Sequence, residues 1–196
     1  SNGMKKIIIA HGWSGSPDEP MLKWIREQMQ SLNCEVIAPF MPHPDIPTIE
    51  DWVSTLGEST GEIDENTFFV GHSVGCQTTI RFLETLPADK KVGGVLLIAP
   101  WFILTLENLD EGESPDVAKP WLETPIDFAK VSSHTKKISA ILSDNDPYVP
   151  VSENKNILEE NLGAKTIIMH DKGHFTESDD VSSLPEAIDI LKKMAE

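Results

Sequence analysis

The stretch TFFVGHSVGCQ, residues 67–77, decides the fold of this chain. Its apolar beginning is typical of a buried strand, and the residues after Gly75 are typical of a helix. Gly71-His72-Ser73-Val74-Gly75 matches the pattern G-x-S-x-G, in which a strand turns sharply into a helix. The glycines on either side of the serine remove side chains that would clash across such a turn. The pattern therefore predicts that Ser73 stands out at the edge of a sheet as a nucleophile.

Strands and helices alternate on both sides of this stretch. Apolar runs predict strands at residues 5–10, 35–40, 67–70, 92–99, 137–142 and 165–169. Helical patterns or caps follow at residues 20–32, from Thr48 onward, after Gly75, at 152–162 and after Ser183, where Ser183 and Glu186 have capping-box spacing. This alternation predicts an α/β fold, a single domain over residues 4–196 with helices on both faces of a mostly parallel six-stranded sheet. The expected strand order is 2-1-3-4-5-6, with the switch point between strands 1 and 3.

Two segments are interpreted separately. Residues 101–133 are irregular and acid-rich, which fits either a lid-like insertion over the carboxyl edge of the sheet or an ordinary surface excursion. Ser1-Asn2-Gly3 before Met4 is interpreted as a remnant of an expression tag.

The composition narrows the classes of partner. The formal net charge of -16 disfavours binding to nucleic acid and to anionic membrane surfaces. No run approaches the ~20 apolar residues that a membrane span needs, and no signal peptide is visible. Cys34 and Cys76 lack a partner at redox or zinc spacing, so we expect buried thiols and a cytoplasmic location. A protein partner is compatible with all of these features.

A nucleophilic serine requires a general base. In folds of this kind the chain order is serine, acid, histidine, and His174 follows the last predicted strand. His170 is its rival, since it lies only four residues earlier. The remaining histidines fit less well: His72 lies inside the turn, and His11, His43 and His134 occupy other loops or earlier positions.

The expected acid follows the fifth predicted strand. Asp146 in Asp144-Asn145-Asp146-Pro147 is the first choice, and Asp144 is the alternative. A loop with this composition is also an ordinary turn, which is compatible with a catalytic role.

Backbone amides are expected to complete the site. The Val74 amide at the helix start and the Trp13 amide after the first strand are the predicted oxyanion donors. His11, Trp101 and Trp121 are candidates for contacts with substrate, and core or lid packing is the alternative for both tryptophans. No cofactor or metal is expected, because Gly173 and the preceding strand argue against a helical zinc pair of His170 and His174.

Taken together, the elbow at residues 71–75, Asp146 in Asp-Pro-Tyr-Val-Pro, and Gly173-His174-Phe175 resemble the α/β-hydrolase superfamily. The short chain, His11-Gly12-Trp13 and the proline-rich loop at 39–45 resemble a narrower group. This group comprises small serine hydrolases related to retinoblastoma-binding protein and to bacterial YdeN-type esterases. The chain departs from common lipase patterns, because Trp13 stands where a small residue is usual.

The resemblance implies an esterase-like or amidase-like hydrolase of small substrates, with Ser73, Asp146 and His174 as its triad. An interaction protein on a hydrolase scaffold with little turnover is the alternative from a different class. A third interpretation keeps the scaffold and changes the reaction to acyl transfer or lyase chemistry.

Overall fold

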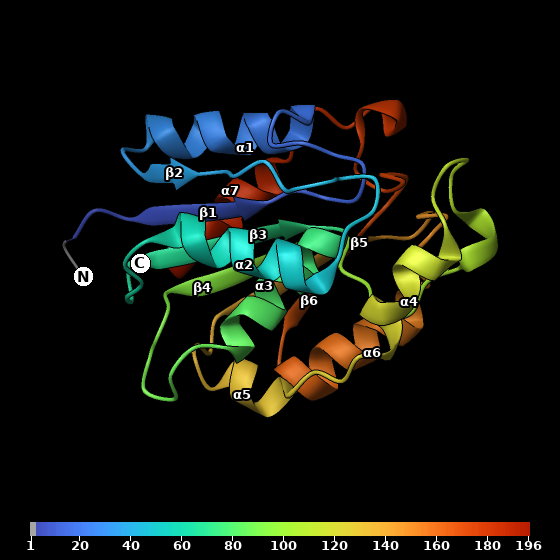
Figure 1. Cartoon of the computed structure of the whole chain (residues 1–196). Coiled ribbons are helices and arrows are strands. Elements are labelled where there is room, and N and C mark those ends of the chain that lie inside the picture. Colours follow the sequence, from blue (N-terminus) through green and yellow to red (C-terminus); the bar gives the residue numbers. More distant parts are fainter. Residues whose placement is uncertain (1–2) are drawn as a thin grey trace.

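The computed structural model describes residues 3–196, which form six strands and seven α-helices (Figure 1). The strands are β1 (Lys6–Ala10), β2 (Glu35–Ile37), β3 (Thr67–His72), β4 (Gly94–Ile98), β5 (Ile138–Ser143) and β6 (Lys165–Met169). The helices are α1 (Pro20–Ser31), α2 (Ile49–Thr60), α3 (Val74–Glu84), α4 (Pro115–Glu123), α5 (Phe128–Ser132), α6 (Val151–Leu162) and α7 (Pro185–Met194). Ser1 and Asn2 of the suspected tag remnant lie outside the described residues.

All six strands are parallel, and their order is β2-β1-β3-β4-β5-β6. The predicted single-domain α/β fold and its strand order are therefore confirmed. β1 lies between β2 and β3, so the connections after β1 and β3 leave toward opposite faces of the sheet. A crevice at the carboxyl ends of β1 and β3 follows from this topology.

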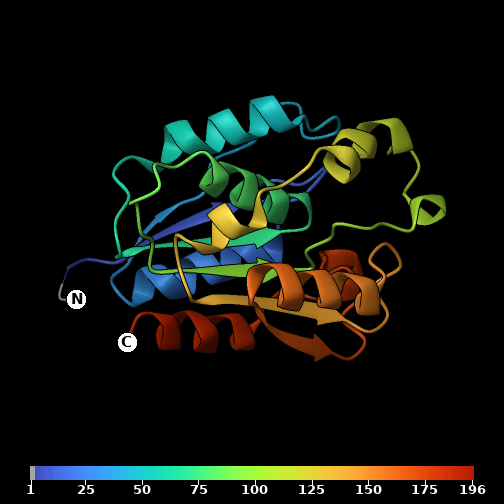
Figure 2. The ribbon, with the colours of Figure 1, turned by 90° about the horizontal axis from the view of Figure 1, so that it is seen from below.

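Two cores cover the two faces of the sheet. On one face Ile7 and Ile9 of β1 pack with α1 and α7, and on the other Ile8 and Ala10 pack with α2, α3, α5 and α6. Adjacent residues of one strand point to opposite faces, so continuous apolar runs are needed to fill both cores. Figure 2 shows the helices on either side of the sheet.

Some boundaries differ from the predictions. β2 ends at Ile37 rather than near Phe40, and the chain leaves the sheet edge toward His11, whose Nε2 accepts the Met41 amide. The predicted capping box of Ser183 and Glu186 was wrong. α7 begins at Pro185, which has no N–H to satisfy, and no side chain caps it.

The irregular stretch 101–133 contains η1 (Leu106–Asn108), α4 and α5. Arg81 connects this stretch to α3, because its guanidinium donates to the carbonyls of Trp121 and Thr124. α4 and the C-terminus lie at opposite ends of the molecule in both views (Figures 1 and 2). Within residues 3–196, no helix combines the length and the apolar character that crossing a membrane requires.

Candidate active site

Ser73 lies on the sharp turn between β3 and α3. Its φ is 58°, which a residue with a side chain adopts only under strain of about 1–3 kcal/mol. The flanking glycines permit this turn. A Cβ atom on Gly71 would lie 2.7 Å from the Cα of Cys76, and one on Gly75 would lie 2.2 Å from the carbonyl oxygen of Ala10. The two glycines therefore let the start of α3 pack directly against the ends of β1 and β3.

Ser73, His174 and Asp146 form a continuous chain of contacts. Ser73 Oγ lies 2.9 Å from His174 Nε2, and His174 Nδ1 lies 2.7 Å from Asp146 Oδ2. The side chain of Asp146 is only 1% exposed and that of His174 is 13% exposed, so water has little access to their contact. The other oxygen of Asp146 accepts the Tyr148 amide at 3.0 Å, which fixes the carboxylate. The structure thus brings together the three residues that the sequence singled out first.

The backbone of His174 is held from two directions. Asp179 Oδ2 accepts the His174 amide at 2.9 Å, and His72 Nε2 donates to the His174 carbonyl oxygen at 2.9 Å. Gly173 allows the Asp179 carboxyl to approach the backbone this closely, because Gly173 has a φ of 54° and a Cβ there would lie 2.3 Å from Asp179 Cγ. Asp179 has no counterpart in the sequence motifs, and only the folded loop reveals its role.

The rival residues lie elsewhere. His170 and Asp144 pair with each other through His170 Nδ1 and Asp144 Oδ2 at an exposed position. This contact raises the pKa of His170 and lowers that of Asp144. Within residues 3–196 neither residue forms a hydrogen bond with Ser73, so this pair stands apart from the Ser73 contacts.

Val74 follows Ser73 directly in the chain, and Trp13 lines the same cavity as Ser73. Within residues 3–196 neither amide donates a hydrogen bond to the protein, although Val74 is fully buried. Gly12 brings the loop after β1 against the turn, since a Cβ there would lie 3.1 Å from Ser73 Cβ. The Trp13 indole donates to the carbonyl of Asp45 at 2.9 Å and so anchors this loop. Amides that carry no hydrogen bond within the protein are a requirement of an oxyanion site.

Of the three residues predicted to contact substrate, Trp101 alone reaches the cavity beside Ser73. Trp101 lines this cavity, and its indole Nε1 donates to Ser73 Oγ at 3.2 Å. His11 is fully buried, and its two ring nitrogens contact the Gly12 carbonyl and the Met41 amide. Trp121 is also buried and donates to the Pro47 carbonyl at 3.0 Å. His11 and Trp121 therefore support the loops around the site rather than lining the cavity.

His11 is neutral by this arrangement. Its Nε2 accepts a backbone amide, so the proton sits on Nδ1 and is donated to the Gly12 carbonyl. Burial lowers the pKa of His11, and its ring packs edge-on against Phe40 and Trp52. A neutral, fully bonded imidazole acts here as a support for the loop after β1.

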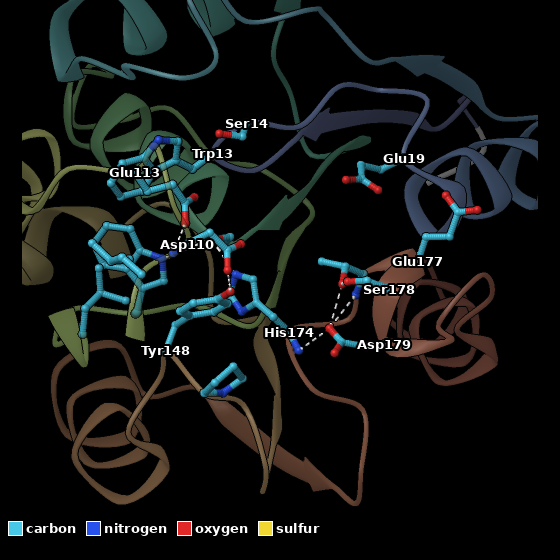
Figure 3. Close-up of a pocket in the computed structure, with 16 residues that line it drawn as sticks. Trp13, Ser14, Glu19, Asp110, Glu113, Tyr148, His174, Glu177, Ser178 and Asp179 are labelled. Atoms are coloured by element: carbon cyan, nitrogen blue, oxygen red, sulfur yellow. Dashed lines mark hydrogen bonds between the residues drawn. The ribbon is translucent and has the colours of Figure 1, made fainter. Parts of the chain in front are cut away.

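The cavity beside Ser73 has a volume of about 390 Å³, and its wall is acidic. Its lining includes five carboxylates, and the described part of the chain contributes no Lys or Arg to it: Glu19, Asp110, Glu113, Glu177 and Asp179. Figure 3 shows Glu19 and Glu177 on one side of His174, with Asp110 and Glu113 on the other. Asp110 and Glu113 belong to the acid-rich segment of the sequence, whereas Glu19 precedes α1, and Glu177 and Asp179 lie in the short 3-10 helix η2 (Glu177–Asp179) between β6 and α7.

Burial raises the pKa of two of these carboxyl groups. For Glu19 the main cause is desolvation, and the neighbouring charge of Glu177 adds to it. For Glu113 the main cause is again desolvation, and the charge of Asp110 contributes. Asp110 also accepts the Tyr148 hydroxyl at 2.6 Å, which positions it at the rim of the cavity.

The chain matches a known family over nearly its whole length. The family model described as "Serine hydrolase" matches residues 7–193. The chain belongs to the serine hydrolase family. YdeN of Bacillus subtilis (strain 168), which is named as a hydrolase, is 31% identical over 189 residues, covering 95% of this chain and 94% of YdeN. The serine hydrolase RBBP9 of Rattus norvegicus is 26% identical over 190 residues, covering 95% of this chain and 88% of RBBP9.

Solved structures place this serine hydrolase in the same group. The crystal structure of the ydeN gene product from B. subtilis superposes with a TM-score of 0.88 at 28% identity, covering 97% of this chain and 98% of that one. Est1E from Butyrivibrio proteoclasticus, solved with ferulic acid, has a TM-score of 0.70 at 12% identity, covering 98% and 91% of the two chains. The second likeness concerns the fold alone. This protein is therefore a hydrolase of the α/β-hydrolase superfamily, in a group with YdeN and RBBP9.

Proposed function

We propose that this serine hydrolase cleaves a small carboxylic ester or amide through an acyl-enzyme on Ser73. The observation that carries the proposal is the chain of contacts from Ser73 Oγ through His174 to the buried carboxylate of Asp146. In this role His174 takes the proton of Ser73 as the hydroxyl attacks the carbonyl carbon. Asp146 holds the imidazole in the tautomer whose Nε2 can accept that proton.

The amides of Trp13 and Val74 supply the second requirement of this chemistry. Attack on a carbonyl places negative charge on its oxygen, and amides already in place stabilise that charge without rearrangement. After the leaving group departs, His174 activates a water molecule that hydrolyses the acyl-enzyme. A protein that only binds a partner, the alternative interpretation, does not need a serine hydroxyl, an imidazole and a buried carboxylate in hydrogen-bond contact with one another.

The first experiment is reaction with a fluorophosphonate probe, followed by intact-mass measurement. We expect one adduct on the wild-type protein and none on Ser73→Ala. Ser178→Ala is the matched control, because Ser178 also lines the cavity, and it should keep the adduct. An adduct on Ser73→Ala would contradict the assignment of the nucleophile. No adduct on the wild-type protein would favour the interaction-protein alternative.

A panel of p-nitrophenyl and aryl-acid esters then tests turnover. The ferulic acid bound to Est1E is a property of that protein, and it suggests including a feruloyl ester in the panel. We expect Ser73→Ala to lower the hydrolysis rate of any accepted ester by at least about 1,000-fold. Equal turnover by the two proteins would contradict the acyl-enzyme.

A further inference from the structure

The indole of Trp101 contacts the oxygen of Ser73 directly. Its Nε1 lies 3.2 Å from Ser73 Oγ, and the side chain is only 1% exposed. An indole N–H can donate a hydrogen bond but cannot accept one. Ser73 Oγ must therefore be the acceptor in this contact.

This direction has a consequence for the neighbouring histidine. A serine hydroxyl has one hydrogen and two lone pairs. Because Trp101 occupies one lone pair, the hydrogen is left for the remaining neighbour, His174 Nε2 at 2.9 Å. One lone pair stays unoccupied, and attack on a carbonyl can proceed only along its direction. Trp101 thus orients both the proton and the attacking electron pair of Ser73.

The backbone at Trp101 is anchored from two helices. Gln77 of α3 donates from Nε2 to the Trp101 carbonyl at 3.0 Å, and Arg81 Nε donates to Gln77 Oε1 at 3.0 Å. On the other side, the Oδ1 of Asn154 in α6 accepts the amides of Phe102 and Ile103 at 2.7 and 3.1 Å. Gln77 and Asn154 are at most 1% exposed, so buried amide groups are committed to holding this segment. Such anchoring fixes the indole relative to α3, which also carries Ser73 at its start.

We propose that Trp101 is a catalytic residue that stabilises charge on Ser73 Oγ, and this rests on the proposed function. In acylation the Oγ–H proton passes to His174 Nε2 while the bond from Oγ to the carbonyl carbon forms; the bond from that carbon to the leaving group then breaks, and the leaving group takes the proton from His174. In deacylation water gives a proton to His174 as its oxygen adds to the carbonyl carbon, the carbon–Oγ bond breaks with its electron pair left on Oγ, and His174 gives that proton to Oγ. Trp101 keeps its own proton throughout and donates a hydrogen bond to Oγ.

Deacylation gains more than acylation from the hydrogen bond that Trp101 donates. An ester oxygen is a weak acceptor, so the Trp101 hydrogen bond is weak in the acyl-enzyme and strengthens as Oγ leaves with negative charge. Only an interaction that is stronger in the transition state than in the ground state raises the rate. In the free enzyme the neutral hydroxyl already accepts this bond, and the gain during acylation is therefore smaller. Trp101 is thus expected to act mainly on the release of Ser73.

The test replaces the N–H without changing the shape of the ring. Benzothienylalanine at position 101 has sulfur in place of the indole N–H, and Trp101→Phe is the simpler companion variant. Trp24→Phe is the control, because Trp24 lies half-buried on α1 and does not line the cavity. Single-turnover reactions with p-nitrophenyl acetate separate acylation, seen as released p-nitrophenol, from deacylation, seen as loss of acetyl mass from the protein. The fluorophosphonate labelling rate reports Ser73 attack independently.

We expect the benzothienyl variant to deacylate about 10- to 100-fold more slowly than wild type, as for loss of a hydrogen bond to a charged group. Its labelling rate should fall less, and its melting temperature should match that of wild type. Deacylation within about threefold of wild type would overturn the role of Trp101. So would a loss seen in Trp101→Phe but not in the benzothienyl variant, since that result assigns the effect to packing. Absence of any labelling of wild type would instead contradict the proposed function itself.

Discussion

At the scale of single residues, His72 is the titratable group of the turn that the proposed reaction does not use. Burial is the main cause that lowers its pKa to about 3, and the nearby His174 adds to this effect. Its Nε2 donates to the His174 carbonyl, while its Nδ1 is buried without a hydrogen-bond partner in the described structure. His72 is therefore neutral and supports the loop that carries His174, without adding a second charge beside Ser73.

This burial predicts a loss of stability in mild acid. Below the ordinary pKa of 6.5 the unfolded chain binds a proton at His72, whereas the folded protein does so only near pH 3. The free energy of unfolding should therefore fall as pH drops from 6.5 toward 3, by up to about 1.4 kcal/mol per pH unit from this residue. Urea unfolding of wild type and His72→Gln at pH values from 6.5 to 3 measures this contribution of His72. Glutamine does not titrate, so the free energy of unfolding of His72→Gln should depend less steeply on pH by that amount. Its side-chain N–H can still donate to the His174 carbonyl. Parallel slopes for the two proteins would contradict the assignment.

The residues of the site differ in how far sequence could predict them. Ser73 and the Val74 amide follow from one local pattern, and His174 and Asp146 follow from the chain order after predicted strands. The contact of Trp101 with Ser73 joins residues from the ends of two different strands, and no local pattern encodes it. The same holds for Asp179, whose carboxylate accepts the His174 amide and the Thr176 hydroxyl within the folded loop.

At the scale of elements, the loop between β6 and α7 delivers His174, and it depends on Gly173. We predict that Gly173→Ala displaces this loop, because the residue needs a positive φ and the new Cβ would meet the Asp179 carboxyl at 2.3 Å. The Ser73–His174 contact would then lengthen, and misplacement of about 1 Å can lower activity about 100-fold. Steady-state hydrolysis and fluorophosphonate labelling measure this loss.

Gly163 provides the matched control for this prediction. It ends α6 with a φ of 62°, and a Cβ there would meet no atom within 4 Å. Gly163→Ala should therefore lower stability by about 1 kcal/mol through backbone strain alone and leave the hydrolysis rate unchanged. Equal activity losses in the two variants would show that the clash with Asp179 is not the cause.

Element order was easier to predict than element ends. The apolar runs and their alternation with helices suffice for the six strands and their order, because a parallel sheet buried on both faces leaves few arrangements. The end of β2 depends on a contact between His11 and the Met41 amide, which lies far away in sequence. α4 escaped prediction because Arg81 and the hydrogen bond of the buried Trp121 to Pro47 hold it in place, rather than a long apolar stripe of its own, and α5 has only five residues.

At the scale of the whole molecule, the distribution of charge is uneven. The chain carries a net charge of -16, and carboxylates concentrate around the cavity beside Ser73. Within residues 3–196, the ion pairs include none of Glu19, Glu113 and Glu177. Partly buried carboxylates without a positive partner favour a cation in the space between them. A negatively charged ester would meet repulsion in the same cavity.

We therefore predict that the enzyme hydrolyses a cationic ester faster than a neutral ester of the same shape. Acetylthiocholine and its isostere with carbon in place of the charged nitrogen form such a pair, and kcat/KM should favour the cation by about 10-fold at low salt. High salt should reduce this ratio, because exposed charges are screened. Glu19→Gln and Glu113→Gln should lower kcat/KM for the cation and leave the neutral ester unchanged. Lower pH should also reduce the ratio of the two kcat/KM values, and it should do so above the ordinary pKa range of a glutamate, because burial raises the pKa of both carboxyl groups. A ratio near one at low salt, or equal losses for both esters in the variants, would contradict electrostatic selection by the cavity.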